Sequence, residues 1–304
     1  MKVDISVVVP HLNQHSGVER LLESLDAQEA PGIRYEVIIA DNGSAAPLSE
    51  ACLAHPLVTV VYESTPGPGH ARNRGVSVAT GEILAFIDAD CTADSGWIQA
   101  ISNHFQEPYA SAVIGGDVRI APRGARVTPI EAYESLFGYR FELYIRRDGY
   151  AGTGNLAMLR KTFDAVGPFG GIHIAEDRDW GQRATRRGFT PAYVPEMVIY
   201  TNARESFSEL ARKWDRHIAH DFAHAEVKKR KLAWTLRSLA LAISPVAEVP
   251  RVLASPRISG TKVRALAWLV LVRIRLYRSR RMLKLLFWGN PEDMALGWHK
   301  NERP

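Results

Sequence analysis

The sequence predicts an α/β fold in which helices cover both faces of a mostly parallel sheet, followed by a basic and amphipathic helical region. Short, nearly uninterrupted apolar runs alternate with helix-like segments through the first 120 residues, as expected of strands that are buried on both faces. Polar residues follow directly after several of these runs. Lys and Arg are concentrated in the last hundred residues.

Four strands are predicted in the first part of the chain from runs of β-branched and other aliphatic residues, at Ile5–Pro10, Glu36–Ala40, Leu57–Tyr62 and Ile83–Ile87. Apolar residues at helical spacing predict helices between them, at Val18–Leu25, His70–Ala79 and Trp97–Phe105. The pattern then becomes mixed. We expect two further strands, an aromatic-rich helix and a helix after an acidic segment, at Ala112–Ile120, Tyr193–Tyr200, Pro129–Tyr144 and Trp180–Arg187. Ligands of such sheets bind beyond the carboxyl ends of the strands.

Length and composition limit the class of protein. The 304 residues, of which 46% are hydrophobic, suffice for one large domain with an appendage or for two domains. Cys52 and Cys91 are too few for a disulfide framework, so a reduced, cytoplasmic compartment is the simplest interpretation. The N-terminal segment begins directly with a strand and lacks the features of a signal peptide.

The charge distribution indicates a different partner for the last third of the chain. Residues 1–204 hold 18 Lys and Arg against 24 Asp and Glu, whereas residues 205–304 hold 20 against nine. This last part contains two long apolar segments, Leu232–Val249 and Val263–Trp288. We expect the second to lie on an anionic membrane surface as an interfacial helix. The alternative is an ordinary amphipathic helix that packs on the domain.

The most informative motif is Asp88-Ala89-Asp90, which directly follows the strand predicted at Ile83–Ile87. Two carboxylates one residue apart repel each other, and Asp is a poor strand residue. A divalent cation removes both objections, because Mg²⁺ and similar ions take carboxylate oxygens and leave positions open for substrate phosphates. The motif therefore predicts metal-dependent handling of a phosphorylated compound. A solvated turn with two unrelated acids is the alternative.

Three further motifs lie where a ligand could bind. Asp41 follows a predicted strand within a turn-forming sequence, and its carboxylate could accept an N–H of a nucleobase. Arg72 stands in the first turn of a helix after a Gly- and Pro-rich loop, an arrangement that can bind phosphate. The stretch from Gly152 to Asn155 would let a ligand approach the backbone. The alternatives are a plain Asx turn at the first motif and a hairpin turn at the last.

An acidic segment, Glu176-Asp177-Arg178-Asp179, precedes a predicted helix. Carboxylates at a helix N-terminus often serve only as caps or as partners of the helix dipole. A carboxylate beside a metal site can also act as a general base. The residues alone leave both interpretations open.

Six segments, taken in order, resemble the GT-A-fold glycosyltransferases of family 2. They are VVVPHLN, VIIADNGS, PGPGHARNRG, FIDADC, GTGNLAMLR and AEDRDWGQRATRRG. The resemblance covers residues 3–200. The resemblance implies a GT-A Rossmann-like fold and an inverting, non-processive hexosyltransferase of polysaccharide biosynthesis. Its donor would be a nucleoside-diphosphate sugar, with UDP as the expected nucleotide. The resemblance also implies a divalent metal cofactor, Mn²⁺ or Mg²⁺, bound by a DxD motif.

The resemblance implies roles for individual residues. Those expected to bind the donor nucleotide are Pro10, Asn13, Asp41, Arg72 and Asp88. Asp90, together with Asp88, would hold the metal. Asp177 would be the catalytic base that takes the proton from the acceptor hydroxyl. The residues expected around the donor sugar and the acceptor are Gly152, Gly154, Asn155 and Glu176.

The chain departs from the family pattern at three points. Cys91 stands where many relatives carry a further Asp, and Thr201-Asn202 stands where relatives often carry a metal-binding His. His217, His220 and His224 on the next predicted helix could supply that ligand; the alternative is that they are solvated or face the acceptor. The segment that ends at Trp214 matches the QxxRW motif of processive relatives poorly, which favours transfer of single sugars.

The sequence leaves three alternative functions. A nucleotidyltransferase that makes sugar nucleotides should carry a Gly-rich, basic loop after the first strand, and HLNQHSGVER contains one Gly. A non-catalytic scaffold that binds sugar nucleotides would not need Asp177. Nucleic-acid binding fits poorly, because the basic residues alternate with long aliphatic runs rather than with aromatic stacking platforms.

Together these observations divide the chain into three parts. Residues 1–110 would form the nucleotide-sugar-binding half of one GT-A domain, and residues 111–204 its acceptor-binding and catalytic half. Residues 205–304 would form a helical, membrane-associating region. We therefore expect a cytoplasmic enzyme that binds peripherally to the cytoplasmic face of a membrane and acts on a glycan or lipid-linked acceptor.

Overall fold

The computed structural model describes residues 3–171, 174–224 and 231–288. The chain divides into two compact units. The first unit comprises Met1–Ala121 and Arg140–Asn202, and the second comprises Pro122–Tyr139 and Ala203–Pro304. Residues 122–139, which we expected in the acceptor-binding half, are thus grouped with the C-terminal helices.

Within the described residues, the first unit contains an eight-stranded sheet in the order β3-β2-β1-β4-β7-β6-β8-β5. Strands β3, β2, β1 and β4 are parallel, as are β6 and β8, whereas β7 is antiparallel to β4 and β6, and β5 to β8. The strands are β1 Ile5–His11, β2 Tyr35–Asp41, β3 Val58–Tyr62, β4 Ile83–Ile87, β5 Cys91–Ala93, β6 Val113–Ala121, β7 Asn155–Leu159 and β8 Ala192–Asn202. The predicted α/β class is confirmed.

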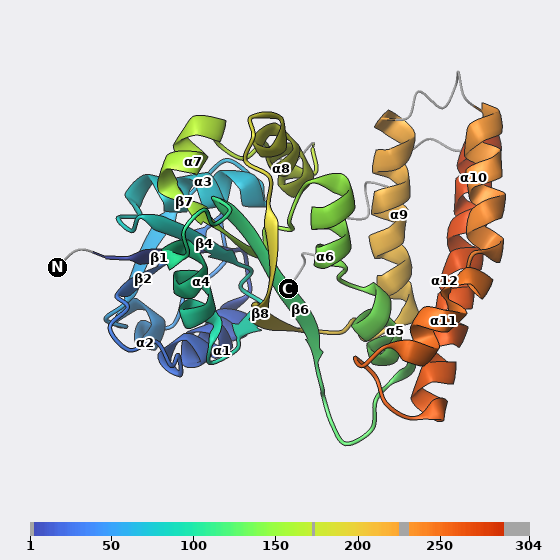
Figure 1. The fold of residues 1–304 in the computed structure, drawn as a ribbon, viewed down its shortest axis with the longest axis horizontal. Helices are drawn as coiled ribbons and strands as arrows, with labels where there is room; N and C mark the ends of the chain where they lie inside the picture. The colour runs from blue at the N-terminus through green and yellow to red at the C-terminus, as the bar shows by residue number, and fades with distance from the viewer. Residues whose placement is uncertain (1–2, 172–173, 225–230, 289–304) are drawn as a thin grey trace. The chain divides into compact units, whose positions relative to one another are not determined.

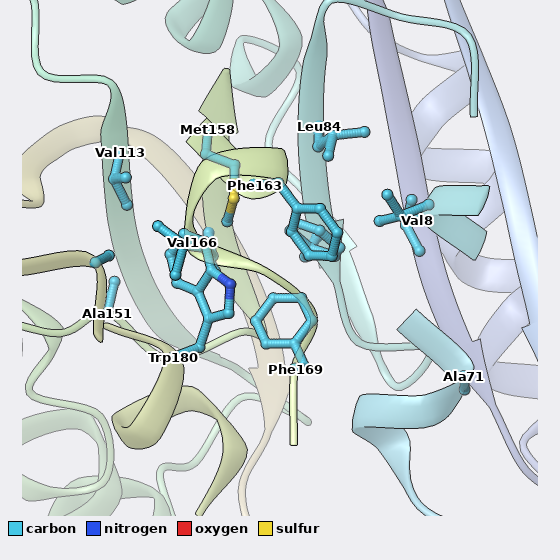
Figure 2. Packing of buried hydrophobic residues seen from close by; sticks show 14 of the residues in the cluster. Val8, Ala71, Leu84, Val113, Ala151, Met158, Phe163, Val166, Phe169 and Trp180 are labelled. Atoms are coloured by element: carbon cyan, nitrogen blue, oxygen red, sulfur yellow. The ribbon is translucent and has the colours of Figure 1, made fainter. Parts of the chain in front are cut away.

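Helices flank this sheet (Figure 1). They are α1 His15–Asp26, α2 Glu50–Leu53, α3 Pro68–Val78, α4 Trp97–Gln106, α6 Phe141–Leu143, the π-helix η1 Tyr144–Asp148, α7 Arg160–Val166 and α8 Glu176–Arg186. Figure 2 shows one side of the core, where Trp180 of α8 lies beside Phe163 and Phe169. The ring centroids of Phe169 and Trp180 are 5.5 Å apart. This aromatic cluster packs α8 against the sheet, because it also includes Leu84 of β4 and Met158 of β7.

The second unit is helical, and its longest helix runs through its core. The helices are α5 Pro129–Phe137, α9 Phe207–His224, α10 Lys231–Ile243, the short 3₁₀ helix η2 Val246–Glu248, α11 Val249–Ala254 and α12 Thr261–Trp288. Helix α12 contacts α5, α9, α10 and α11. Its Ala267, Leu271 and Ile274 are fully buried and pack with Tyr133 of α5 and Leu210 of α9. Helix α12 is therefore the helix around which the unit is assembled.

This packing bears on the predicted interfacial helix at Val263–Trp288. One face of α12 packs against protein, as the alternative interpretation expects, through side chains from Ala267 to Leu285. Leu269 and Leu276 of the same helix are exposed. In the part of the chain that the structure describes, no single helix qualifies as a candidate membrane span. Helix α10 and the segment Val246–Ala254 qualify only as a pair, with a bend of 53° between them.

The observed elements differ from the prediction in three main ways. Helix α8 begins at Glu176 rather than at Trp180, so the acidic segment forms its first turn. The helix expected at Pro129–Tyr144 is interrupted after Phe137 and continues as α6 and the π-helix. The strands β5 and β7 were not predicted, because both are short and depend on pairing with distant strands.

Candidate active site

The carboxyl ends of β2, β1 and β4 form one edge of the sheet. His11 at the end of β1 is in register with Asp41 at the end of β2. Strand β4 pairs with the other side of β1 and ends at Ile87, directly before Asp88. Asp41 and Asp88 therefore lie at the same edge, on either side of β1, where ligands of parallel sheets bind.

Arg72 connects the end of β4 with the start of α8. Its Nη2 donates to Oδ1 of Asp88 at 2.7 Å, and its Nη1 donates to Oε1 of Glu176 at 3.0 Å. The Arg72 side chain is only 3% exposed. Asp177, next to Glu176 in the sequence, also feels the charge of Arg72, so three acids are coupled to one buried guanidinium. The cluster has an excess of negative charge, which favours binding of a cation.

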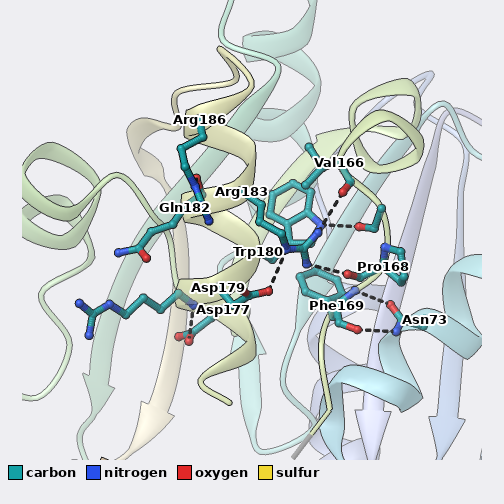
Figure 3. Close-up of polar contacts among 12 residues, drawn as sticks. Asn73, Val166, Pro168, Phe169, Asp177, Asp179, Trp180, Gln182, Arg183 and Arg186 are labelled. Carbon is teal, nitrogen blue, oxygen red and sulfur yellow. Dashed lines mark hydrogen bonds and ion pairs between the residues drawn. The ribbon is translucent and has the colours of Figure 1, made fainter. Parts of the chain in front are cut away.

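Helix α8, which carries Glu176 and Asp177, is held in place by hydrogen bonds around its first two turns (Figure 3). Arg183 donates to the carbonyls of Val166 and Pro168 at 2.9 and 2.7 Å and pairs with Asp179 at 2.8 Å. Asn73 of α3 exchanges two hydrogen bonds with the backbone of Phe169, both at 2.9 Å. The loop before α8 is thereby fixed to the same helix that carries Arg72.

Asp177 is half-buried in the first turn of α8. Its Oδ1 accepts a hydrogen bond from the backbone N–H of Arg178 at 2.7 Å. Burial, and then the charge of Glu176, raise the pKa of Asp177 from 3.8 to about 6, and the charge of Asp88 adds to this. Asp177 is therefore still ionised at neutral pH but is a stronger base than an ordinary aspartate.

The loop after β2 is organised by Asp41 and Asn13. Oδ1 of the buried Asp41 accepts the N–H groups of Gly43 and Ser44 at 3.0 and 2.8 Å. Asn13 has a positive φ of 54°, and its Oδ1 accepts the N–H of Ala45 at 2.8 Å. The Asx turn that the sequence left as an alternative for Asp41 is thus present, and it fixes the carboxylate at the sheet edge.

His11 is a residue of this edge to which the sequence assigned no role. It is 1% exposed, and within the described residues neither ring nitrogen has a hydrogen-bond partner. Burial lowers the pKa of His11, so the ring is neutral at pH 7. Pro10, which precedes His11 and was predicted to bind the donor nucleotide, is half-buried on β1. The position of His11 directly after a buried strand was the only signal available in the sequence.

The residues of the Gly-rich stretch 152–155 have different surroundings: Gly154 lies beside Asp88, whereas Asn155 is buried in the core. A Cβ at Gly154 would lie 2.7 Å from Oδ2 of Asp88, so the lack of a side chain there leaves space for the carboxylate. A Cβ at Gly152 would lie 2.4 Å from the ring of Phe141. Asn155 is fully buried, and its amide bonds to the carbonyls of Asp117 and Met197 and to the indole of Trp97. Its contacts join β6, β7, β8 and α4.

The two acids of the DxD motif fit a divalent metal. The Asp88 side chain is 42% exposed, and Asp90 is exposed, so both can reach a solvated ion. Mg²⁺ and Mn²⁺ sites of this kind use one or two carboxylates together with waters and substrate phosphates. Among the residues that the structure describes, no group of three His, Cys, Asp or Glu is arranged to hold a metal.

The positions that depart from the family pattern lie next to each other. Cys91 of β5 is paired with Thr201 of β8. Burial, followed by the charge of Asp90, raises the pKa of the Cys91 thiol well above its ordinary value, which does not suit a thiolate ligand. Asn202 ends the same strand and is exposed.

The candidate third ligands belong to the second unit. The ring of Trp214 lies under the guanidinium of Arg278 at 3.5 Å and is 5.2 Å from the ring of His217. Trp214 and His217 are therefore part of an aromatic and cationic cluster within that unit. The side chains of His220 and His224 lie outside the described part of the structure.

Two tyrosines near Asp177 belong to no motif that the sequence singles out. The rings of Tyr144 and Tyr150 are stacked, with centroids 5.6 Å apart and an interplanar angle of 3°. Burial first, and then the charge of Asp177, raise the pKa of both phenols. A Cβ at Gly181 would lie 2.3 Å from Cβ of Tyr150, so Gly181 allows α8 to approach this pair. The aromatic-rich composition of the segment was visible, but its proximity to Asp177 was not.

Comparisons with known proteins identify the family. Residues 6–173 match the family described as Glycosyl transferase family 2. The chain is 28% identical over 216 residues to the glycosyltransferase AglE of Haloferax volcanii, covering 69% of this chain and 70% of AglE. It is 34% identical over 246 residues to the glycosyltransferase GlyG of Streptococcus pneumoniae, covering 74% and 79% of the two chains.

A solved structure has a similar fold. The mannosyltransferase PcManGT from Pyrobaculum calidifontis, in complex with GDP-Man and Mn²⁺, has a TM-score of 0.59 at 18% identity, covering 95% of this chain and 89% of PcManGT. Its fold is thus shared along nearly the whole chain. With the family match and the two glycosyltransferase relatives, the conclusion is that this protein belongs to glycosyl transferase family 2 and is a glycosyltransferase.

Proposed function

We propose that the protein is a metal-dependent, inverting glycosyltransferase that moves one sugar at a time to a glycan or lipid-linked acceptor at the cytoplasmic face of a membrane. The single observation that carries this proposal is the bridge made by Arg72 between Asp88 and Glu176. It joins the end of β4, where the donor diphosphate would bind, to the first turn of α8, where Asp177 stands. Binding and proton transfer would therefore occur side by side.

Asp88 and Asp90 are the residues that would hold the metal, whose charge would stabilise the diphosphate leaving group. The Mn²⁺ in the complex of PcManGT supports this part of the proposal, and Mg²⁺ is the alternative ion. Arg72 supplies a fixed positive charge at the same place and keeps Asp88 oriented. Asp41, Pro10 and Asn13 would contact the nucleoside at the neighbouring edge of the sheet, with UDP as the expected nucleotide.

Asp177 would take the proton from the acceptor hydroxyl while the oxygen attacks the anomeric carbon from the side opposite to the diphosphate. This geometry gives inversion. A raised pKa favours the step, because the carboxylate stays ionised at neutral pH and still binds a proton more readily than an ordinary aspartate. General-base assistance of this kind contributes roughly 10²–10⁴-fold to the rate.

The substitution Asp177→Asn tests this role. We expect transfer, or the slower hydrolysis of the donor by water, to fall by about 10²–10⁴-fold while donor affinity stays within about twofold. Asp179→Asn is the matched control, since Asp179 lies in the same helical turn but is paired with Arg183. Turnover by Asp177→Asn equal to that of the control would refute the assignment of the base.

A further inference from the structure

Helices α10 and α11, with the short 3₁₀ helix η2 between them, expose a row of large aliphatic side chains. Of the twelve large hydrophobic residues that are prominently exposed among the described residues, six come from this short segment. Their exposed fractions lie between 52% and 73%. We call this row the α10–α11 ridge, and its members are Leu232, Leu236, Leu239, Ile243, Val246 and Leu253. Exposed apolar rows of this extent generally mark a surface that contacts something else.

The ridge is held outward by the opposite face of α10. Trp234 and Ser238 are buried, and they bond to α12 through Met282 and Ser279. Figure 1 shows α10 running alongside α12. The four ridge residues of α10, Leu232, Leu236, Leu239 and Ile243, recur three or four positions apart, which places them on one side of that helix. Val246 and Leu253 continue the ridge beyond the 53° bend. Because α10 is fixed on its inner side, it cannot turn the ridge into the core.

The sequence around the ridge is strongly basic. Between residues 228 and 264 the chain has nine Lys or Arg and one acid, Glu248. Arg237 is paired with Asp221 and Arg251 with Glu248, and the segment keeps a net positive charge. Such a segment attracts an anionic surface at distances within the Debye length. A second copy of the chain is a poor partner, because pairing two ridges would also bring two sets of these cations together.

We propose that the α10–α11 ridge is the surface by which this protein docks onto an anionic lipid bilayer. The aliphatic side chains would enter the boundary between headgroups and acyl chains, and the surrounding cations would contact lipid phosphates. The 13-residue α10 is about 20 Å long, shorter than the roughly 30 Å hydrocarbon core, which suits a helix that lies in the interface. The inference deepens the proposed membrane association and assigns it to α10 and α11 instead of α12.

Vesicle binding of a ridge variant tests the proposal. The triple variant Leu236→Gln/Leu239→Gln/Ile243→Gln changes only exposed positions, so its thermal unfolding should match that of the parent. Co-sedimentation with vesicles of phosphatidylcholine and phosphatidylglycerol should weaken by at least about tenfold. Leu53→Gln/Tyr109→Gln is the matched control, because it removes exposed apolar residues of the first unit and should bind like the parent.

Two further measurements show whether the ridge binds an anionic bilayer rather than another partner. Binding of the parent should be much weaker to pure phosphatidylcholine and should fall with added salt. A fluorophore attached at Leu239→Cys should be quenched by lipids brominated near the headgroup. Unchanged vesicle binding by the triple variant would overturn the proposal, as would a dimer of the parent that the same variant dissociates. The vesicle assay contains neither donor nor acceptor, so its result does not depend on the proposed transfer reaction. Donor titrations test the proposed transfer reaction separately.

Discussion

Arg72 is the residue on which the electrostatics of the site depend. It is the buried cation shared by Asp88 and Glu176, and its charge also lowers the pKa of Asp177. Three acids are thus coupled to one guanidinium, although only the contacts to Asp88 and Glu176 are direct. Removing the Arg72 guanidinium should therefore change the pKa of Asp177, a carboxylate to which it donates no hydrogen bond.

We therefore expect Arg72→Met to shift the pH dependence of catalysis. The base must be ionised, so activity rises with pH through the pKa of Asp177, which is about 6, and falls roughly tenfold per pH unit below it. Without the nearby cation the pKa of Asp177 rises, and the midpoint moves to higher pH. Profiles of kcat/KM against pH measure the shift. Arg72→Lys, which keeps the charge, should move the midpoint less; equal midpoints in all three proteins would contradict the coupling.

Asp177 should also reduce stability at neutral pH. Its folded-state pKa of about 6 lies above the ordinary 3.8, so the folded protein binds this proton more tightly than the unfolded chain does. Stability therefore falls as pH rises from about 4 to about 6, and the penalty is complete above that window. Asp177→Asn should gain about 1 to 2 kcal/mol at pH 7.5 and nothing at pH 4. Thermal unfolding of metal-free protein at both pH values measures this, and a variant less stable at pH 7.5 would contradict it.

At the scale of elements, the site depends on the close approach of the Gly154 backbone to the Asp88 carboxylate. Gly154 directly precedes β7, and this strand pairs antiparallel with β4, so Gly154 lies beside Asp88 at the end of that strand. Helix α8 reaches the same place because Arg183 and Trp180 fix it to the preceding loop. The position of the acids is therefore set by a strand pairing and a helix anchor.

We expect Gly154→Ala to impair metal and donor binding in a folded protein. The added methyl would lie 2.7 Å from Oδ2 of Asp88, and the carboxylate would have to turn away. Metal-dependent donor affinity should fall by about tenfold or more, with a change in stability of about 1 kcal/mol. Calorimetric titration measures the affinity. Gly124→Ala serves as control, since a Cβ there meets no atom within 4 Å; a parent-like affinity of Gly154→Ala would show that the approach is unimportant.

How well the elements could be predicted follows from the range of the interactions that form them. The strands β1, β2 and β4 were visible because their residues are apolar on both faces, a property of the local sequence. Strand β5 has three residues, and its pairing with β8 spans about a hundred residues of chain, so no local pattern reveals it. The start of α8 was placed too late because its first turn carries only acids and Arg178, without an apolar stripe.

At the scale of the whole molecule, the sequence indicated a division near residue 204 but not which segments join. Residues 122–139 are grouped with the C-terminal helices because Tyr133 and Leu136 of α5 pack with Leu271 and Ile274 of α12. The spacing of apolar residues along the sequence does not reveal which distant segments pack together. The same limit applied to the site: Asp88 and Asp177 were recognisable from their motifs, whereas Glu176 as a partner of Arg72, 104 residues away, was not.

The central claim is that the acids coupled through Arg72 form a metal-dependent donor site. Calorimetric titration with UDP-, GDP-, dTDP- and CMP-sugars, with and without Mn²⁺, tests it most directly, on the parent and on Asp90→Asn. We predict that one nucleotide class binds, that Mn²⁺ strengthens the binding, and that Asp90→Asn removes most of this effect. Binding of the same strength without metal, or unchanged in Asp90→Asn, would contradict the claim.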